Sequence, residues 1–97
     1  MPVDVTFDEL GGVLTVTFDQ ALVPGPVWAL NWVIFTGTWR YPGFNAIAAA
    51  DRVTVQVDPG DPDPSPSGLT YLAVPPDVVG LVSGQPAAAF TGYPWHP

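Results

Sequence analysis

Apolar and polar residues alternate strictly in three segments of this chain, and no other feature limits its fold as strongly. Valine, leucine or phenylalanine occupies every second position in the segments Val3–Phe7, Leu14–Phe18 and Val53–Val57. Successive side chains of a β-strand point to opposite faces, so this pattern is typical of a strand with one face on a core and the other in water. Such strands belong mainly to antiparallel sheets. The chain is therefore predicted to be all-β.

Turn-forming residues divide the rest of the chain into further extended segments. The densest stretch, residues 59–68, holds four prolines and two glycines, so it is predicted to be an exposed loop. Strands are expected near residues 2–7, 13–19, 28–36, 38–41, 44–49, 52–58, 69–74 and 87–93. About seven short strands with turns every 8–12 residues are typical of an immunoglobulin-like antiparallel β-sandwich. That fold is the prediction for the whole chain.

Two stretches fit the strand pattern less well. The alanine-rich residues 46–50 are also compatible with a helical turn, although they lead directly into an alternating strand, which favours the extended form. The C-terminal residues 94–97 have no identifiable partner, and the only imidazole of the chain, His96, is expected to be mobile there. A mobile imidazole cannot be positioned for a Ser-His-Asp mechanism.

The tryptophans of the third expected strand are interpreted as core residues. Trp28 and Trp32 share one face of residues 28–36 with Leu30 and Ile34. A buried tryptophan on the third strand is a hallmark of immunoglobulin-like sandwiches. Both tryptophans are therefore predicted to be buried.

Length and charge limit the function classes. The 97 residues suffice for one domain, residues 1–97, and apolar runs such as Trp32–Phe35 are far shorter than the ~20 residues of a membrane span. No signal peptide is visible at the N-terminus. The net charge of −7 repels phosphate backbones and anionic lipid, so neither nucleic acid nor a membrane is an expected partner. With one histidine and no cysteine, the chain cannot supply a closed zinc site, and no enzymatic activity is expected.

The order of several short motifs resembles a known family. Val5-Thr6-Phe7, the run Leu14–Asp19, Val53–Val57 and Leu69-Thr70-Tyr71 are followed by Leu81, Gly84, Ala88 and Phe90. In this order and spacing they resemble the SwmB-type Ig-like repeat of bacterial surface and secreted proteins. The chain is also similar to small Ig-like accessory proteins of tailed phages. The resemblance implies a non-enzymatic structural or adhesive module of a cell surface or virion, with other protein subunits as partners and a homo-oligomer as an open alternative.

Aromatic residues outside the expected core form the first candidate site. Trp39, Tyr41 and Trp95 lie beside glycine, proline or arginine rather than in a clean alternation. They are predicted to form an exposed interaction patch for a protein partner. The alternative is a carbohydrate-binding module, because flat aromatic faces bury the apolar faces of sugar rings.

A cluster of acidic residues is the second candidate site. Asp58, Asp61 and Asp63, with Asp77 further along, supply the hard oxygen ligands that Ca²⁺ prefers. Their spacing lacks the order of an EF-hand loop, which favours a solvated acidic loop. Calcium stays the alternative, and no other cofactor is expected.

Overall fold

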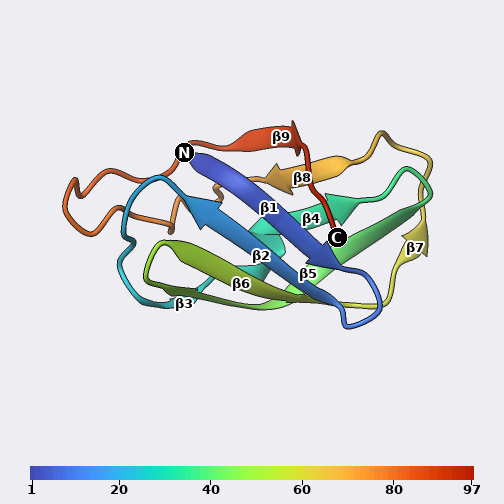
Figure 1. Ribbon diagram of the computed structural model, residues 1–97, viewed down its shortest axis with the longest axis horizontal. Coiled ribbons are helices and arrows are strands. Elements are labelled where there is room, and N and C mark those ends of the chain that lie inside the picture. The colour runs from blue at the N-terminus through green and yellow to red at the C-terminus, as the bar shows by residue number, and fades with distance from the viewer.

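The computed structural model describes residues 1–97 and contains two antiparallel sheets, which share one strand and so form a continuous nine-stranded sheet. The first sheet contains, in spatial order, β1 (Pro2–Asp8), β2 (Val13–Phe18), β6 (Arg52–Val57), the C-terminal part of β5 (Trp39–Ala49) and β3 (Gly25–Val27). The second contains β9 (Phe90–Tyr93), β8 (Gly68–Tyr71), β4 (Trp32–Phe35), the N-terminal part of β5 and β7 (Asp61–Pro62). Without the short β3 and β7, seven strands remain, and each sheet contains four of them because β5 belongs to both. The prediction of an antiparallel β-sandwich of about seven strands is therefore confirmed (Figure 1).

The strand β5 joins the two sheets. Its residues up to Pro42 pair with β4, and those from Gly43 onward pair with β6. The sequence predicted two strands with a turn at Pro42 and Gly43, but the chain continues through a register shift between Gly43 and Asn45. An extra residue in a strand bends it and increases its twist, which lets one strand serve both sheets.

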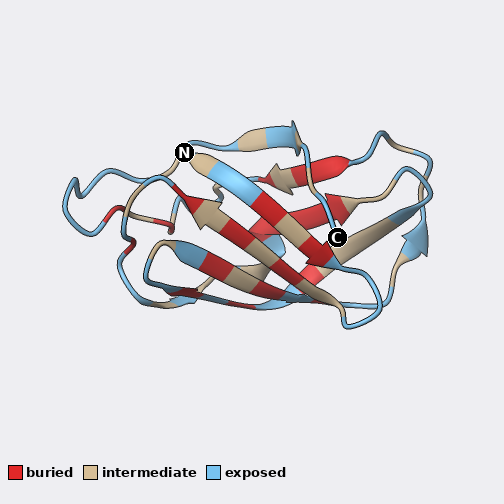
Figure 2. Ribbon diagram, in the orientation of Figure 1, coloured by how far each residue is buried: buried red, intermediate tan, exposed pale blue.

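The core lies between the sheets and follows the predicted alternation closely. Inward-facing residues of β2 and β6 are buried, and their neighbours along each strand are not (Figure 2). Trp32 stacks on Tyr71 with ring centroids 4.5 Å apart, and Phe90 meets Trp32 edge-on at 6.4 Å. Val3 is exposed although it was expected to share a face with Val5, because the pairing of β1 with β2 shifts register between Pro2 and Asp4.

The first half of the third expected strand is not extended. Residues Ala29–Asn31 form a short 3-10 helix, η1, and the strand begins only at Trp32. The core prediction is confirmed for Trp32, which has no exposed surface, but it is wrong for Trp28, which is 56 % exposed. The helical turn breaks the period of two, so Trp28 and Leu30 no longer share the buried face of Trp32 and Ile34.

The C-terminal residues have a partner after all. The backbone N–H of His96 donates to the carbonyl of Val5 at 3.0 Å, and the N–H of Phe7 donates to the carbonyl of His96 at 2.9 Å. The segment after β9 thus runs parallel to β1 at the edge of the first sheet, as Figure 1 shows. It connects the sheets at the side opposite β5. The expectation of an unattached tail is wrong, because the edge of β1 offered free backbone groups.

The loop at residues 59–68 is mostly exposed, as predicted, but it contributes β7, which pairs with the start of β5. No helix in the structure has the length and hydrophobicity that a membrane-spanning helix needs.

Candidate interaction surface

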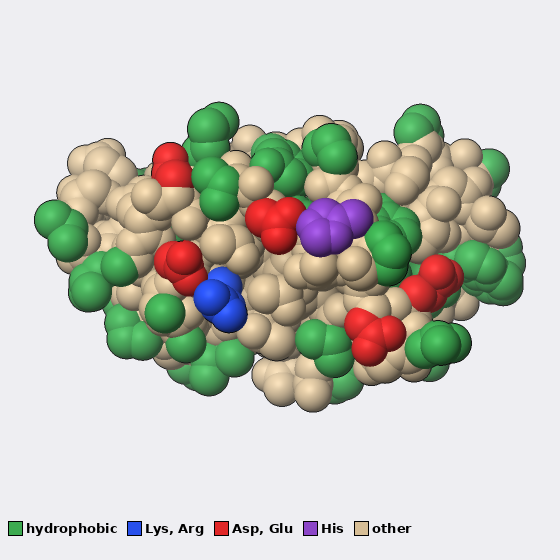
Figure 3. Space-filling view, in the orientation of Figure 1, with side chains coloured by type: hydrophobic (Ala, Val, Ile, Leu, Met, Phe, Trp, Pro, Cys, Tyr) green, Lys and Arg blue, Asp and Glu red, His purple; other side chains and the backbone are tan.

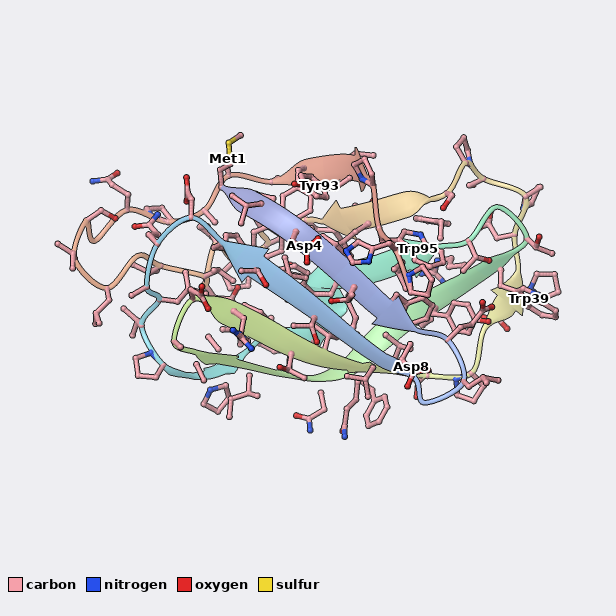
Figure 4. The ribbon with its side chains drawn as sticks, viewed as in Figure 1. Met1, Asp4, Asp8, Trp39, Tyr93 and Trp95 are labelled. Carbon is pink, nitrogen blue, oxygen red and sulfur yellow. The ribbon has the colours of Figure 1, made fainter.

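The three aromatic residues of the predicted patch do not lie together in the structure. Tyr41 and Trp95 are partly buried, and both contact Phe7, with ring centroids 5.3 and 5.4 Å away. Trp95 donates from Nε1 to the carbonyl of Phe35 at 2.9 Å. Trp39 is 40 % exposed and lies apart from Trp95, near the end of the molecule that carries β7 (Figure 4). Tyr41 and Trp95 thus come together, Trp39 does not join them, and a binding role for the three stays a prediction.

The hydroxyl of Tyr41 also ties the loop between β1 and β2 to β5. It donates to the Glu9 carboxylate at 2.7 Å. That hydrogen bond, with burial and the negative charge of Glu9, raises the pKa of Tyr41 to about 12. The residue therefore has a structural partner of its own.

The predicted acidic site is dispersed. No group of three or more Asp, Glu, His or Cys side chains is arranged to hold a metal ion. Asp63 accepts a hydrogen bond from the backbone N–H of Ser65 at 2.9 Å, which lowers the pKa of Asp63. Asp61 lies opposite Arg40 in the pairing of β7 with β5. The structure does not gather Asp58 with these two, and calcium binding stays a prediction without a formed site.

The structure contains a surface groove that the sequence did not predict, with a volume of about 650 Å³. The segment from β3 into η1 forms one wall, and the bend of β5 forms the other. Its exposed apolar side chains are Trp28, Leu30 and Phe44. Around them lie Asn45, Asp58 and Asp77. We call this surface the Trp28 groove.

A hydrogen-bond network holds the Trp28 wall in place. The Asp77 carboxylate accepts hydrogen bonds from the backbone N–H of Trp28, from Asn31 Nδ2 at 3.3 Å and from the Tyr71 hydroxyl at 3.2 Å. The buried Asn31 side chain also donates to the carbonyl of Pro75 and accepts from the N–H of Val74, both at 2.9 Å. Burial, with the nearby charge of Asp77, raises the pKa of Tyr71 to about 12. The wall is therefore fixed to the core before any partner arrives.

A signal for this groove is visible in the sequence in retrospect. Asn31 interrupts an otherwise apolar run, and a buried amide needs hydrogen-bond partners that a plain strand does not provide. The segment Pro24-Gly25-Pro26 just before it already favours a turn. The partners of the Asn31 side chain lie 43, 44 and 46 residues away, so the pattern alone could not identify them.

Both apolar and polar side chains line the Trp28 groove. The apolar faces suit a partner that buries hydrophobic surface, and the carboxylates and the Asn45 amide suit hydrogen-bond donors or a cation. No protein-family model matches the sequence, and no characterised protein or solved structure is significantly similar to it. A function for this chain is therefore inferred from this surface and from the fold.

Proposed function

We propose that the chain is a non-enzymatic structural or interaction module that binds another protein subunit through the Trp28 groove. The observation that supports this proposal is the exposure of three large apolar side chains beside one another, with Trp28 at 56 %, Leu30 at 69 % and Phe44 at 55 %. Contiguous apolar surface of this kind marks interaction sites on soluble proteins. Aromatic side chains that can be buried completely contribute most to such interfaces.

The proposed setting is an accessory position in a bacterial surface or tailed-phage virion assembly. Its support is the resemblance of the strand motifs to SwmB-type repeats and to phage accessory proteins, together with the sandwich fold. Figure 3 shows many apolar side chains toward the rim of this view, and acidic, basic and histidine side chains across its middle.

Co-sedimentation with virions or cell envelopes of the organism that encodes the chain tests this proposal. The unchanged chain is expected to sediment with the particles, and Phe44→Ser is expected to remain in the supernatant. Ile47→Ser is the matched control, because Ile47 lies on the same strand and is 51 % exposed but does not line the groove. Equal sedimentation of both variants would refute a role for the groove.

Carbohydrate binding is the second candidate function. The observation that favours it is the position of Trp28 in one groove with Asn45 and Asp58. The Asn45 amide can donate and accept hydrogen bonds with sugar hydroxyls, and the Asp58 carboxylate can accept them. It predicts a shift of tryptophan fluorescence on addition of a glycan, and Trp28→Phe should abolish the shift. A flat response across a broad glycan panel would remove this candidate.

A further inference from the structure

The Trp28 groove carries negative charge that the molecule does not neutralise. The ion pairs of the structure join the N-terminus to Asp19, Arg52 to Asp51 and His96 to Asp4. Asp58 and Asp77, which line the groove, have no cationic group within 4.0 Å. All hydrogen bonds to the Asp77 carboxylate come from neutral donors. An occupant with a positive charge would therefore meet two uncompensated carboxylates.

The chain has no cation to place there itself. It contains two arginines and no lysine. Arg52 pairs with Asp51, and Arg40 lies opposite Asp61 and near Asp63, where its charge contributes to the lowered pKa of Asp63. A second copy would bring its own charge of −7 to the groove. Like charges across an interface are unfavourable, so the charge complementarity favours a different partner.

The same groove also exposes large apolar side chains, which limits the class of cation. Trp28, Leu30 and Phe44 would remain in contact with water beneath a small hydrated ion. An arginine side chain suits the site better, because its guanidinium binds carboxylates with two parallel hydrogen bonds and stacks on aromatic rings. A volume of about 650 Å³ is in the range of drug-sized ligands, so it holds a few side chains and not an entire domain.

The geometry points to a short segment of a partner protein in which apolar residues flank an arginine or lysine. The basic group would lie between Asp58 and Asp77, and the apolar residues would cover Trp28, Leu30 and Phe44. This inference depends on the proposed function, because it names the partner chemistry of the same groove. A glycan, which is uncharged in most cases, would leave both carboxylates without a counter-charge.

Titration with synthetic peptides tests the inference without knowledge of the natural partner. The probe is a short peptide that alternates valine with arginine, and its binding is followed by tryptophan fluorescence and calorimetry. Two comparison peptides replace every arginine by glutamate or every valine by glycine. The valine–arginine peptide is expected to bind at least about ten-fold more tightly than either comparison peptide, because only it satisfies both the charge and the apolar surface.

Matched variants locate the binding. Asp58→Asn is expected to weaken binding of the valine–arginine peptide several-fold and to reduce its salt dependence. Asp61→Asn is the control, because it removes the same charge from an exposed position outside the groove. Equal effects of the two variants would show attraction to the net charge alone and would overturn the inference.

The two proposals fail in different ways. If the glutamate peptide binds as well as the arginine peptide while Phe44→Ser still prevents co-sedimentation, the charge inference is wrong and the interaction module stands. If Phe44→Ser co-sediments like the unchanged chain, the proposed function itself is wrong. Binding of the arginine peptide that Phe44→Ser does not weaken would overturn the inference as well.

Discussion

Gly43 shows how one residue determines the path of β5. A Cβ atom at this position would lie 2.6 Å from the carbonyl oxygen of Ala29 and 2.9 Å from Val55 Cγ1. Real side chains do not approach backbone oxygen so closely, and neither neighbour can move freely, since Val55 is buried. The absence of a side chain at Gly43 allows β5 to pass against η1, and Gly43 and Ala29 both line the Trp28 groove.

Gly43→Ala is therefore expected to destabilise the protein by about 1–3 kcal/mol, the usual cost of forcing extra volume into a packed core. Chemical denaturation followed by tryptophan fluorescence measures the change. Gly11→Ala is the control, because its added Cβ would meet only the end of the exposed Asp8 side chain, which can move away. Equal unfolding midpoints for the Gly43 variant and the unchanged chain would contradict this description of the bend.

For single residues, the alternation of apolar and polar positions predicts well which side chains are buried. It fails where the backbone is not a regular strand with a period of two residues. The buried positions of β2 and β6 follow directly from every second residue being apolar. Val3 and Trp28 were misplaced, the first by a register shift and the second by a 3-10 turn. Neither irregularity has a local signature as strong as the alternation itself, because long-range pairing decides both.

Among the secondary-structure elements, the segment after β9 was the most difficult to predict from sequence. Its prolines argue against a strand, and its pairing depends on an edge of β1 that lies about ninety residues earlier in the chain. Beyond the backbone pairing, His96 Nε2 lies 2.7 Å from the Asp4 carboxylate. The Tyr93 hydroxyl adds a hydrogen bond to the carbonyl of Pro2 at 3.2 Å. The two termini of the chain thus hold each other in place.

The contact between His96 and Asp4 predicts a pH dependence of stability. The hydrogen bond to Asp4 raises the pKa of His96 above its usual value of about 6.5, because it favours the protonated ring in the folded state. The stabilisation is fully present below about pH 6.5 and is lost as the pH rises through the raised pKa of the folded state. His96→Gln should therefore lower the Tm at about pH 6 and leave it unchanged at about pH 9.

Thermal melts of the two proteins across this pH range provide the measurement. Asp4→Asn removes the other partner of the contact and should reproduce the behaviour of His96→Gln. A constant difference in Tm from acidic to alkaline pH would mean that charge on His96 plays no part in holding the tail.

For the whole molecule, the sandwich fold was predictable because several strands repeat the same alternation of apolar and polar residues. Errors in single elements did not change the predicted fold class. The Trp28 groove was not predictable, because its residues come from β3, η1, β5 and two separate loops. The predicted aromatic patch was inferred from the residues that flank each aromatic residue in the sequence. In the structure two of its three members, Tyr41 and Trp95, pack against Phe7. Surface sites require knowledge of which distant segments meet, whereas burial can be read from local periodicity.

The charge distribution of the whole molecule predicts that the isolated chain is a monomer. A net charge of −7 and the carboxylates in the groove oppose contact between two copies of the apolar surface. Light scattering coupled to chromatography over a concentration series should give a mass near 10.3 kDa throughout. A defined dimer that Phe44→Ser dissociates would show instead that a second copy occupies the groove.

Acrylamide quenching of tryptophan fluorescence tests the central claim, that Trp28 lies at the surface and forms a groove there. Of the four tryptophans, Trp28 is the most exposed and Trp32 is completely buried. Trp28→Phe is expected to reduce quenching more than substitution of any other tryptophan, whereas Trp32→Phe should leave the accessible emission in place. If Trp28→Phe leaves quenching unchanged, Trp28 belongs to the core, the groove does not exist as described, and both proposals lose their basis.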